Sequence, residues 1–291
     1  MLRRWKIRSD GVKQRFNFSP LRKEIVKLYE LGLSARNVGK KLKISHSRVL
    51  KILESENIDR RKIVKPILNE DYLKLTISRA YLLGVMCGDG CVFSGIENKG
   101  KWFFKSYIVH LSVKDRDFLD EFIKHFINVY GFSPKIYYRD RKNKKWSNIW
   151  VARVKRKLVY EDLARYNFGG NKWKVPNEVI NSKEEIVCSF LKGFYDSEGS
   201  FIIGSRGASL SIYSTSKKGI EEVKRLTEGI GIKVSEIKID SRPFRKNECY
   251  YFFITDRKSF RAFLNKMGFS IKRKQDRVLH YLSKLSNMRS K

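Results

Sequence analysis

Residues 82–90, LLGVMCGDG, and residues 191–199, LKGFYDSEG, follow one pattern of Leu, any residue, Gly, four further residues, an acid and Gly. Each segment ends an apolar stretch, and the pattern predicts a helix that stops at the acid. The two acids, Asp89 and Glu198, would therefore lie at the C-terminal ends of two equivalent helices. We expect the Gly after each acid to adopt the left-handed conformation that ends many helices.

Small residues recur on one face of each expected helix. Gly84 and Gly88 are four residues apart, as are Gly193 and Ser197, so each pair shares a helical face. Two such faces can pack backbone to backbone, which would bring the two acids side by side. The negative end of each helix dipole then calls for a compensating cation, and oxygen ligands of this kind are typical of divalent metal ions. The alternative is two core helices that end in acid-Gly, but two copies in one basic chain favour the metal site.

The two motifs resemble those of the LAGLIDADG homing endonucleases, in the single-chain form that carries two motifs. The resemblance covers residues 76–285 and includes residues 172–180, which are similar to the linker between the halves of such proteins. Segments after each motif also repeat at an offset near one hundred residues, as an internal duplication would produce. The matched segments are residues 109–122 with 210–223 and residues 152–163 with 252–264.

The fold class implied is α+β, with two pseudo-symmetric LAGLIDADG half-domains whose antiparallel β-sheets form a DNA-binding saddle. Alternating apolar and polar residues predict strands at 107–113 and 150–155 and hairpins at 134–142 and 235–251. Helices that cover the sheets are expected at 116–130, 157–166, 217–229 and 258–267. We expect the half-domains to span residues 66–183 and 184–291, after a small all-α domain at residues 1–65.

The first domain is expected to bind DNA. Residues 23–55 predict a helix, a loop, a second short helix, a turn and a third helix, and this layout resembles a helix-turn-helix. The alternative is a small three-helix bundle for protein contacts. By analogy the residues that face DNA are Ser45, Ser47, Arg48 and Lys51. Two basic segments would add phosphate contacts, a linker at Arg60, Arg61 and Lys62 and an N-terminal arm with Arg3, Arg4 and Lys6.

Composition is consistent with a nucleic-acid partner inside the cell. The chain has 63 Lys and Arg against 30 Asp and Glu, a formal net charge of +33 that attracts a polyanion. Its four cysteines show no metal-site spacing and are read as free intracellular thiols. No stretch is long and apolar enough to span a membrane, and no signal peptide is evident. We expect a monomer that is cytoplasmic or nucleoid-associated, with an organelle as a further location.

The resemblance assigns the site residues. It implies that Asp89 and Glu198 are the catalytic metal ligands, helped by the carbonyls of Gly88 and Ser197. Mg²⁺ is the expected cofactor, and Mn²⁺ or Ca²⁺ are alternatives at the same site. By strand position, polar residues near the reacting water are His110 with Ser211, and Lys155 with Arg257 or Lys258. Further DNA contacts are expected from Ser112, Arg139, Arg141, Arg153, Ser211, Arg242 and Arg245.

The function implied is that of a site-specific double-strand DNA endonuclease with a long, weakly symmetric target and a role in intron homing. Two alternatives on the same fold remain, an RNA-splicing maturase that binds intron RNA and a non-cleaving DNA-binding transcription regulator. Both acids are present, which favours the metal-dependent nuclease. Cys87 stands where the motif has its first Asp, whereas Asp196 keeps that position. We therefore expect Asp196→Asn to be milder than substitution of either metal ligand.

Overall fold

The computed structural model divides the chain into two compact units, residues 1–65 and residues 66–291. Each unit is described by itself. The described residues are 5–7, 13–15, 19–30, 33–59, 69–100, 102–140, 147–205, 207–240, 242 and 247–287. Several basic residues predicted to contact DNA lie outside the described residues, namely Arg3, Arg4, Arg60, Arg61, Lys62, Arg141 and Arg245.

Three helices pack together in the first unit. They enclose a small apolar core that includes Ile25, Val38, Val49 and Leu53. Helices lie where the apolar pattern predicted them, but DNA binding by this unit stays a prediction. The elements are β1 (Trp5–Ile7), which pairs with β2 (Lys13–Arg15), α1 (Ser19–Glu30), α2 (Ala35–Lys41) and α3 (His46–Ser55).

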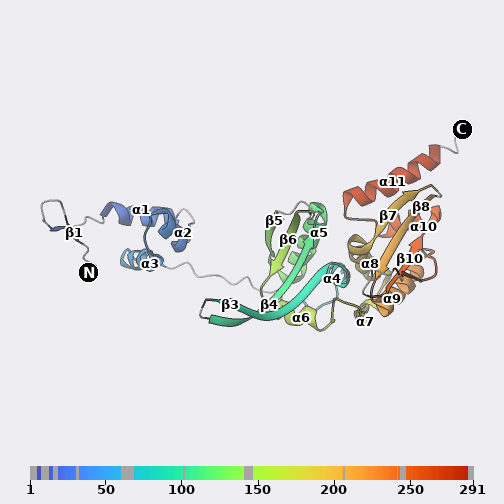
Figure 1. Ribbon diagram of the computed structural model, residues 1–291, viewed down its shortest axis with the longest axis horizontal. Coiled ribbons are helices and arrows are strands. Elements are labelled where there is room, and N and C mark those ends of the chain that lie inside the picture. Colours follow the sequence, from blue (N-terminus) through green and yellow to red (C-terminus); the bar gives the residue numbers. More distant parts are fainter. Residues whose placement is uncertain are drawn as a thin grey trace. The chain divides into compact units, whose positions relative to one another are not determined.

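The second unit repeats one order of elements, helix, two strands, helix, two strands, helix (Figure 1). The first copy consists of α4 (Ile77–Cys87), β3 (Gly90–Lys99), β4 (Trp102–Val113), α5 (Arg116–Tyr130), β5 (Lys135–Arg139), β6 (Ile149–Val154) and α6 (Lys157–Ala164). The second consists of α8 (Glu184–Glu198), β7 (Ser200–Gly204), β8 (Gly207–Ser214), α9 (Lys217–Gly229), β9 (Lys238–Asp240), β10 (Cys249–Ile254) and α10 (Arg257–Lys266). The short α7 (Asn177–Ile180) precedes the second copy, and α11 (Lys272–Asn287) follows it.

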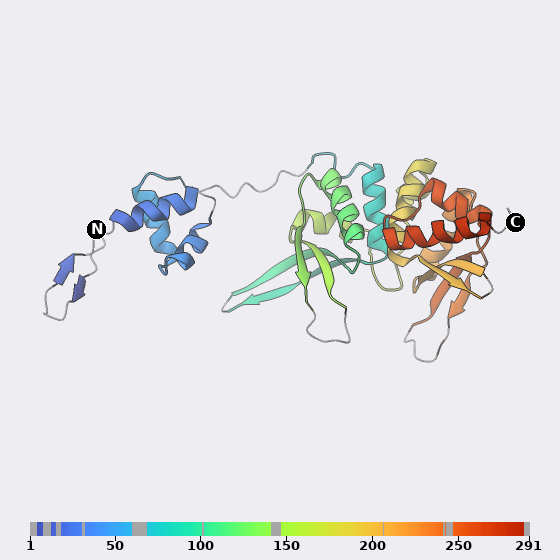
Figure 2. The same ribbon diagram turned by 90° about the horizontal axis from the view of Figure 1, so that it is seen from above.

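Each copy contains one antiparallel four-stranded sheet. The strand orders are β3-β4-β6-β5 and β7-β8-β10-β9, so the two sheets have the same topology. This confirms the prediction of two antiparallel sheets in an α+β fold. Figure 2 shows the strands of both copies extending to the same side of the helices. One strand is longer than predicted, because β4 begins at Trp102 and forms with β3 a hairpin that projects beyond its sheet (Figure 1).

The two copies are joined through direct backbone contact between α4 and α8. A Cβ atom added to Gly84 would lie 2.0 Å from the carbonyl oxygen of Phe190, and one added to Gly193 would lie 2.2 Å from that of Tyr81. No side chain fits at either glycine. The prediction that small residues pair the two helices is therefore confirmed, and Leu83, Phe190 and other fully buried apolar side chains extend this contact into one core.

The glycines that follow the two acids act differently from the expectation. Gly199 has φ −70° and ψ 132°, and Gly90 is not among the residues with positive φ, so neither adopts the left-handed conformation. Both are needed for close approach. A Cβ at Gly90 would lie 2.5 Å from the Cα atom of Met86, and one at Gly199 would lie 2.4 Å from the carbonyl oxygen of Tyr195. The first strand of each copy, β3 or β7, therefore starts in close contact with the last turn of the preceding helix.

The final helix connects the second copy to the first. At the start of α11, the Arg273 Nε donates a hydrogen bond to Asp115 Oδ1 at 2.7 Å, and Asp115 directly precedes α5 of the first copy. The Lys272 backbone N–H donates to Asp117 Oδ2, also at 2.7 Å. Because α11 belongs to neither repeat, these contacts connect the segment after the second copy to the first copy. We call α11 with the contacts of Lys272 and Arg273 the strap.

Substitution at Gly84 tests the backbone contact. Gly84→Ala should lower the free energy of unfolding by about 3 kcal/mol or more, because the added methyl overlaps the backbone of α8 and cannot be relieved by a rotamer change. Gly229→Ala is the matched control, since a Cβ there meets nothing within 4 Å. It should be neutral or stabilise by about 0.5–1 kcal/mol. Urea unfolding of both variants measures the difference, and equal stabilities would contradict the close-contact account.

Candidate active site

The two acids of the repeated motifs meet at one end of the α4–α8 pair. Glu198 is the last residue of α8, and Asp89 follows the end of α4 by two residues. Between them, a Cβ on Gly88 would lie 2.4 Å from the Cβ of Ser197 and 3.2 Å from Glu198 Oε1. The Glu198 carboxylate therefore rests on the Gly88 backbone, which lies beside Asp89. Glu198 is partly buried, and Asp89 is exposed on its outer side.

Burial destabilises the charge of both carboxylates. Desolvation, and to a smaller extent the negative charge of Asp89, raise the pKa of Glu198 from 4.5 to about 7. Desolvation by the surrounding protein also raises the pKa of Asp89. In both cases the cation of Lys274 acts in the opposite direction and lowers the pKa. Any further cation at this place would stabilise both ionised carboxylates.

Lys274 is a member of the site that the sequence analysis missed. It lies in α11, is only 9% exposed, and its Nζ donates a hydrogen bond to the carbonyl oxygen of Asp196 at 2.7 Å. That carbonyl is one of the last in α8, so the ammonium sits at the negative end of the helix dipole. The compensating cation expected from the helix ends is thus present. No pattern in the surrounding sequence distinguishes Lys274 from its basic neighbours in α11.

Asp196 has a structural role that its position in the motif did not indicate. It is 1% exposed, and its two carboxylate oxygens accept hydrogen bonds from the Tyr81 hydroxyl at 2.9 Å and the Ser270 N–H at 2.8 Å. These bonds attach the segment before α11 to the α4–α8 pair. Cys87, at the same position in the first motif, is a buried free thiol. These bonds give Asp196 a structural role that Cys87 lacks, and the milder effect of Asp196→Asn on cleavage stays a prediction.

The donor set at the acid pair fits a hard divalent cation. Two carboxylates and nearby main-chain carbonyls are the ligand types that Mg²⁺ and Ca²⁺ prefer. A cavity of about 330 Å³ is lined by Glu198 and Gly88 but not by Asp89, so it lies to one side of the acid pair. Among the described residues there is no cluster of three His, Cys, Asp or Glu side chains suited to a metal. Ligation by the Gly88 and Ser197 carbonyls stays a prediction.

The basic residues nominated to assist the acids lie on the sheets. His110 in β4 pairs in register with Arg153 in β6, and its pKa is lowered by desolvation and then by the charges of Arg153 and Arg139. Lys155 forms an ion pair with Glu97 of the β3–β4 hairpin. His110 also pairs in register with Cys91, two residues after Asp89, so a role of His110 or Lys155 beside the acids stays a prediction. Arg257 is the first residue of α10, so it does not share the position of Lys155 just after the last strand.

The first sheet carries a basic groove on the face opposite its helices. The groove has a volume of about 640 Å³ and brings together three predicted residues, Arg139, Arg153 and Lys155, with Lys135 and Tyr137. The last two were missed, although alternation along β5 places them on the same face as Arg139. Their spacing of two residues was the signal that could have found them.

The other predicted contacts on the sheets are less open. Ser112 in β4 is partly buried. Ser211 is 1% exposed, and its hydroxyl donates to the carbonyl oxygen of Ser200 at 3.1 Å. Arg242 donates from Nε to Asp240 Oδ1 at 2.7 Å, so its guanidinium is held by an acid of β9. Ser211 is thus buried and bonded within its sheet, whereas the Arg242 side chain is 55% exposed and its contact with DNA stays a prediction.

In the first unit, the residues nominated to face DNA surround the start of α3. Ser45 caps this helix, because its hydroxyl oxygen accepts a hydrogen bond from the Arg48 N–H at 3.3 Å. Ser47 and Lys51 are exposed, and Arg48 is partly buried. The Ser45 hydroxyl still has a proton to donate, so its capping role does not exclude a contact with a phosphate.

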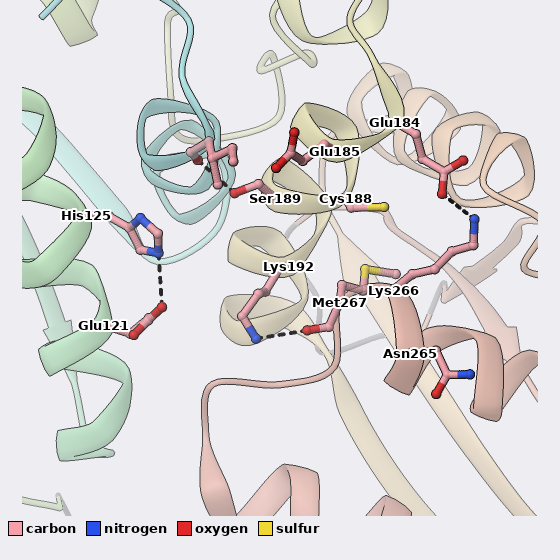
Figure 3. A pocket seen from close by; sticks show the side chains of 11 residues that line it. Glu121, His125, Glu184, Glu185, Cys188, Ser189, Lys192, Asn265, Lys266 and Met267 are labelled. Atoms are coloured by element: carbon pink, nitrogen blue, oxygen red, sulfur yellow. Dashed lines mark hydrogen bonds and ion pairs between the residues drawn. The ribbon is translucent and has the colours of Figure 1, made fainter.

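A second cavity, of about 570 Å³, lies at the opposite end of the α4–α8 pair (Figure 3). Its polar groups are largely bonded to one another. His125 Nε2 lies 3.0 Å from Glu121 Oε1, and Lys192 Nζ donates to the carbonyl oxygen of Met267 at 2.9 Å. Lys266 also pairs with Glu184. Because these charges are already compensated, we assign no chemistry to this cavity.

Comparison with known proteins agrees with the duplicated structure. The family model of the LAGLIDADG-like domain matches the chain twice, at residues 76–187 and 185–268. The chain belongs to the LAGLIDADG family. The two matches coincide with the two copies of the fold, and α11 with Lys274 lies beyond the second.

Relatives of this LAGLIDADG protein include archaeal chains. An uncharacterised protein of Methanocaldococcus jannaschii is 34% identical over 196 residues, which cover 64% of this chain and 68% of that one. The homing endonuclease I-ApeI of Aeropyrum pernix is 22% identical over 191 residues, 65% of this chain and 80% of that one. A solved structure of an I-SmaMI mutant has a TM-score of 0.50 at 15% identity and covers 75% of this chain and 92% of that one, which shows a shared fold. No helix in the described ranges is long and apolar enough to cross a membrane.

The raised pKa of Glu198 predicts a pH-dependent stability. The ordinary value of 4.5 applies to the unfolded chain and about 7 to the folded one, so the folded state loses stability as the pH rises from 4.5 through 7. Glu198→Gln has no proton to lose. In the metal-free protein it should become more stable than the wild type across this window, by on the order of 1–3 kcal/mol above pH 7. Denaturant unfolding in EDTA at several pH values measures the difference, and an offset that does not change with pH would contradict the assignment.

Lys274 should stabilise the metal-free site. Lys274→Met leaves the end of α8 and the nearby carboxylates without their cation, so the free energy of unfolding in EDTA should fall by about 2–4 kcal/mol. Added Ca²⁺ should raise the melting temperature of this variant more than that of the wild type, because removing one positive charge favours a divalent cation. Lys272→Met is the control, since that side chain is exposed on the same helix. Equal melting temperatures for the two variants, with and without Ca²⁺, would refute this role.

Proposed function

We propose that the protein is a divalent-metal-dependent, site-specific endonuclease that cuts both strands of duplex DNA. The observation that carries the proposal is the pair Asp89 and Glu198, held together by the α4–α8 backbone contact and flanked by two sheets. One of these sheets carries the basic groove. Membership of the LAGLIDADG family supports the proposal, as does the name of the relative I-ApeI, a homing endonuclease.

The chemistry follows from charge. Asp89 and Glu198 would hold Mg²⁺, or Mn²⁺ or Ca²⁺ in its place, together with main-chain carbonyls such as those of Gly88 and Ser197. A divalent ion bound there supplies charge compensation for the phosphate and lowers the pKa of water. The chain contributes the geometry. The fixed helix pair would hold the two carboxylates near a pseudo-two-fold axis, so that each could serve one strand of a duplex.

The proposed substrate is a long duplex with weak symmetry. A net charge of +33 favours binding to phosphates, and such binding should weaken steeply with salt. The basic groove would follow one half of the target, and the first unit would add contacts at one end through Ser47, Arg48 and Lys51. We propose that the protein acts as a monomer inside the cell in intron homing. The two acids distinguish this proposal from a non-cleaving regulator, and preferred binding to intron RNA would favour a maturase.

Removing either acid tests the mechanism. Asp89→Asn and Glu198→Gln keep the side-chain size but remove a negative charge, so cleavage of a cognate duplex should fall by about two orders of magnitude or more. DNA affinity should be unchanged or higher, because a carboxylate close to a phosphate repels it when no metal is present. Single-turnover cleavage with Mg²⁺ and gel-shift titration in EDTA measure the two effects.

The experiment needs a target and a control. Plasmids that carry the intronless form of candidate host genes supply the target, and mapping of the ends identifies the cut. Glu185→Gln is the control, because Glu185 is an exposed acid at the other end of α8. It should cut as the wild type does. Near-normal cutting by both acid variants would exclude the paired-carboxylate mechanism whatever the target is.

A further inference from the structure

We propose that the two sheets read different base compositions, so that the DNA target has one guanine-containing half and one half rich in A·T pairs. Arg153 is the residue that would read guanine under the first sheet, and Phe253 holds the matching position under the second. This inference rests on the DNA-binding part of the proposed function and not on cleavage.

Strand register defines the matching positions. In the first sheet, Arg153 of β6 pairs with His110 of β4, and in the second Phe253 of β10 pairs with Ser211 of β8. Directly paired residues lie on the same face of an antiparallel sheet. In both sheets this is the face opposite the helices, because the neighbouring positions Ala152, Val154, Phe252 and Ile254 belong to the core that the helices share. Arg153 and Phe253 are thus equivalent by structure and opposite in chemistry.

Arg153 is positioned for a ligand that the protein does not itself supply. Its guanidinium carbon lies 5.4 Å from the centroid of the Tyr137 ring, a cation–π contact that fixes the side chain. Its Nε is buried and has no hydrogen-bond partner among the described residues, and the same holds for the Tyr137 hydroxyl and His110 Nδ1. Buried polar groups without partners are costly. Arg153 and Tyr137 line the basic groove, so a small movement of their side chains would let a polar ligand complete this bonding.

Position in the sheet separates a base contact from a phosphate contact. β6 is an inner strand of its sheet, so Arg153 lies on the floor of the basic groove. Arg139 ends the edge strand β5, and Lys155 follows the end of β6. When a β surface enters the major groove, its floor faces base edges and its margins face the backbone. Arg153 would therefore meet bases, while Arg139 and Lys155 would meet phosphates.

The chemistry of Arg153 selects guanine. An Arg fork donates to both O6 and N7 of guanine, whereas cytosine presents a donor and adenine only one acceptor beside a donor. His110 lies beside Arg153 in the strand register, and burial and the charges of Arg153 and Arg139 lower the pKa of His110. Lys135, which pairs in register with Arg153, adds a further cation on the same face.

The second sheet offers aromatic side chains at the corresponding place. The ring of Tyr251 stacks on that of Tyr213 at a centroid distance of 5.0 Å, and the ring centroids of Phe253 and Tyr251 are 5.2 Å apart. On the described strand positions of this face the charged residues are Lys238 and Asp240, and Asp240 holds Arg242. Apolar side chains contact the methyl group of thymine in the major groove. This face would therefore favour A·T pairs.

Selection of binding sites tests the inference on the full chain. Random duplexes are bound in Ca²⁺, separated by gel shift and sequenced for the wild type, Arg153→Ala and Phe253→Ala. Arg153→Ala should lose a guanine preference of about tenfold or more at one position and leave the rest of the motif unchanged. Phe253→Ala should weaken a thymine preference on the other side of the motif centre. Lys155→Ala is the control, which should lower affinity for all sequences alike.

Exchange of the two residues is the sharper test. The double variant Arg153→Phe with Phe253→Arg should move the guanine preference from one half of the motif to the other. If Arg153→Ala weakens all sequences equally, Arg153 contacts phosphate and the inference fails. It also fails if the exchange leaves the guanine where it was, or if the wild type selects no motif. A protein that selects the expected motif but never cuts it would refute the proposed nuclease and leave this inference standing.

Discussion

The contact between the backbones of α4 and α8 is the constraint on which the rest of the second unit depends. Gly84 and Gly193 leave no room for a side chain, so the distance and the rotation between the two helices are fixed by main-chain atoms. The ends of the helices, and with them Asp89 and Glu198, are therefore held in fixed relative positions. The two sheets are held in fixed positions as well, because each begins directly after one helix. Gly90 and Gly199 allow each first strand to start in close contact with the last turn of that helix.

The same geometry brings two carboxylates together, and the nearby ammonium of Lys274 compensates part of their negative charge. Burial of Glu198 at the helix end, and to a smaller extent the negative charge of Asp89, raise the pKa of Glu198 to about 7. Lys274 offsets part of this effect and is itself buried at a cost. These partly compensated charges thus lower the stability of the folded protein until a further cation binds at the site. Strain of this kind is expected at a functional centre, where charge is arranged for a ligand and not for the empty protein.

The sequence predicted the parts of this structure that repeat. The two motifs, the helices after them and the antiparallel strands all followed from periodicity and self-similarity. Residues outside the repeat were not accessible in this way. Lys274 reaches the site through tertiary packing of α11, and no local pattern marks it. The partner of Lys155 in the second copy was misplaced because α10 already begins at Arg257. The expected role of the two glycines was wrong because close packing, and not handedness, requires them.

The strap formed by α11 has a consequence for how the protein matures. Both repeats are complete by residue 268, yet the ammonium at the acid pair and the bonds from Arg273 and Lys272 to the first copy come from later residues. During synthesis, Asp115 of the first copy therefore gains its partner Arg273 only after both repeats have been made. The acid pair gains its ammonium at the same late stage. A truncated product would carry both motifs and still lack the charge that balances them.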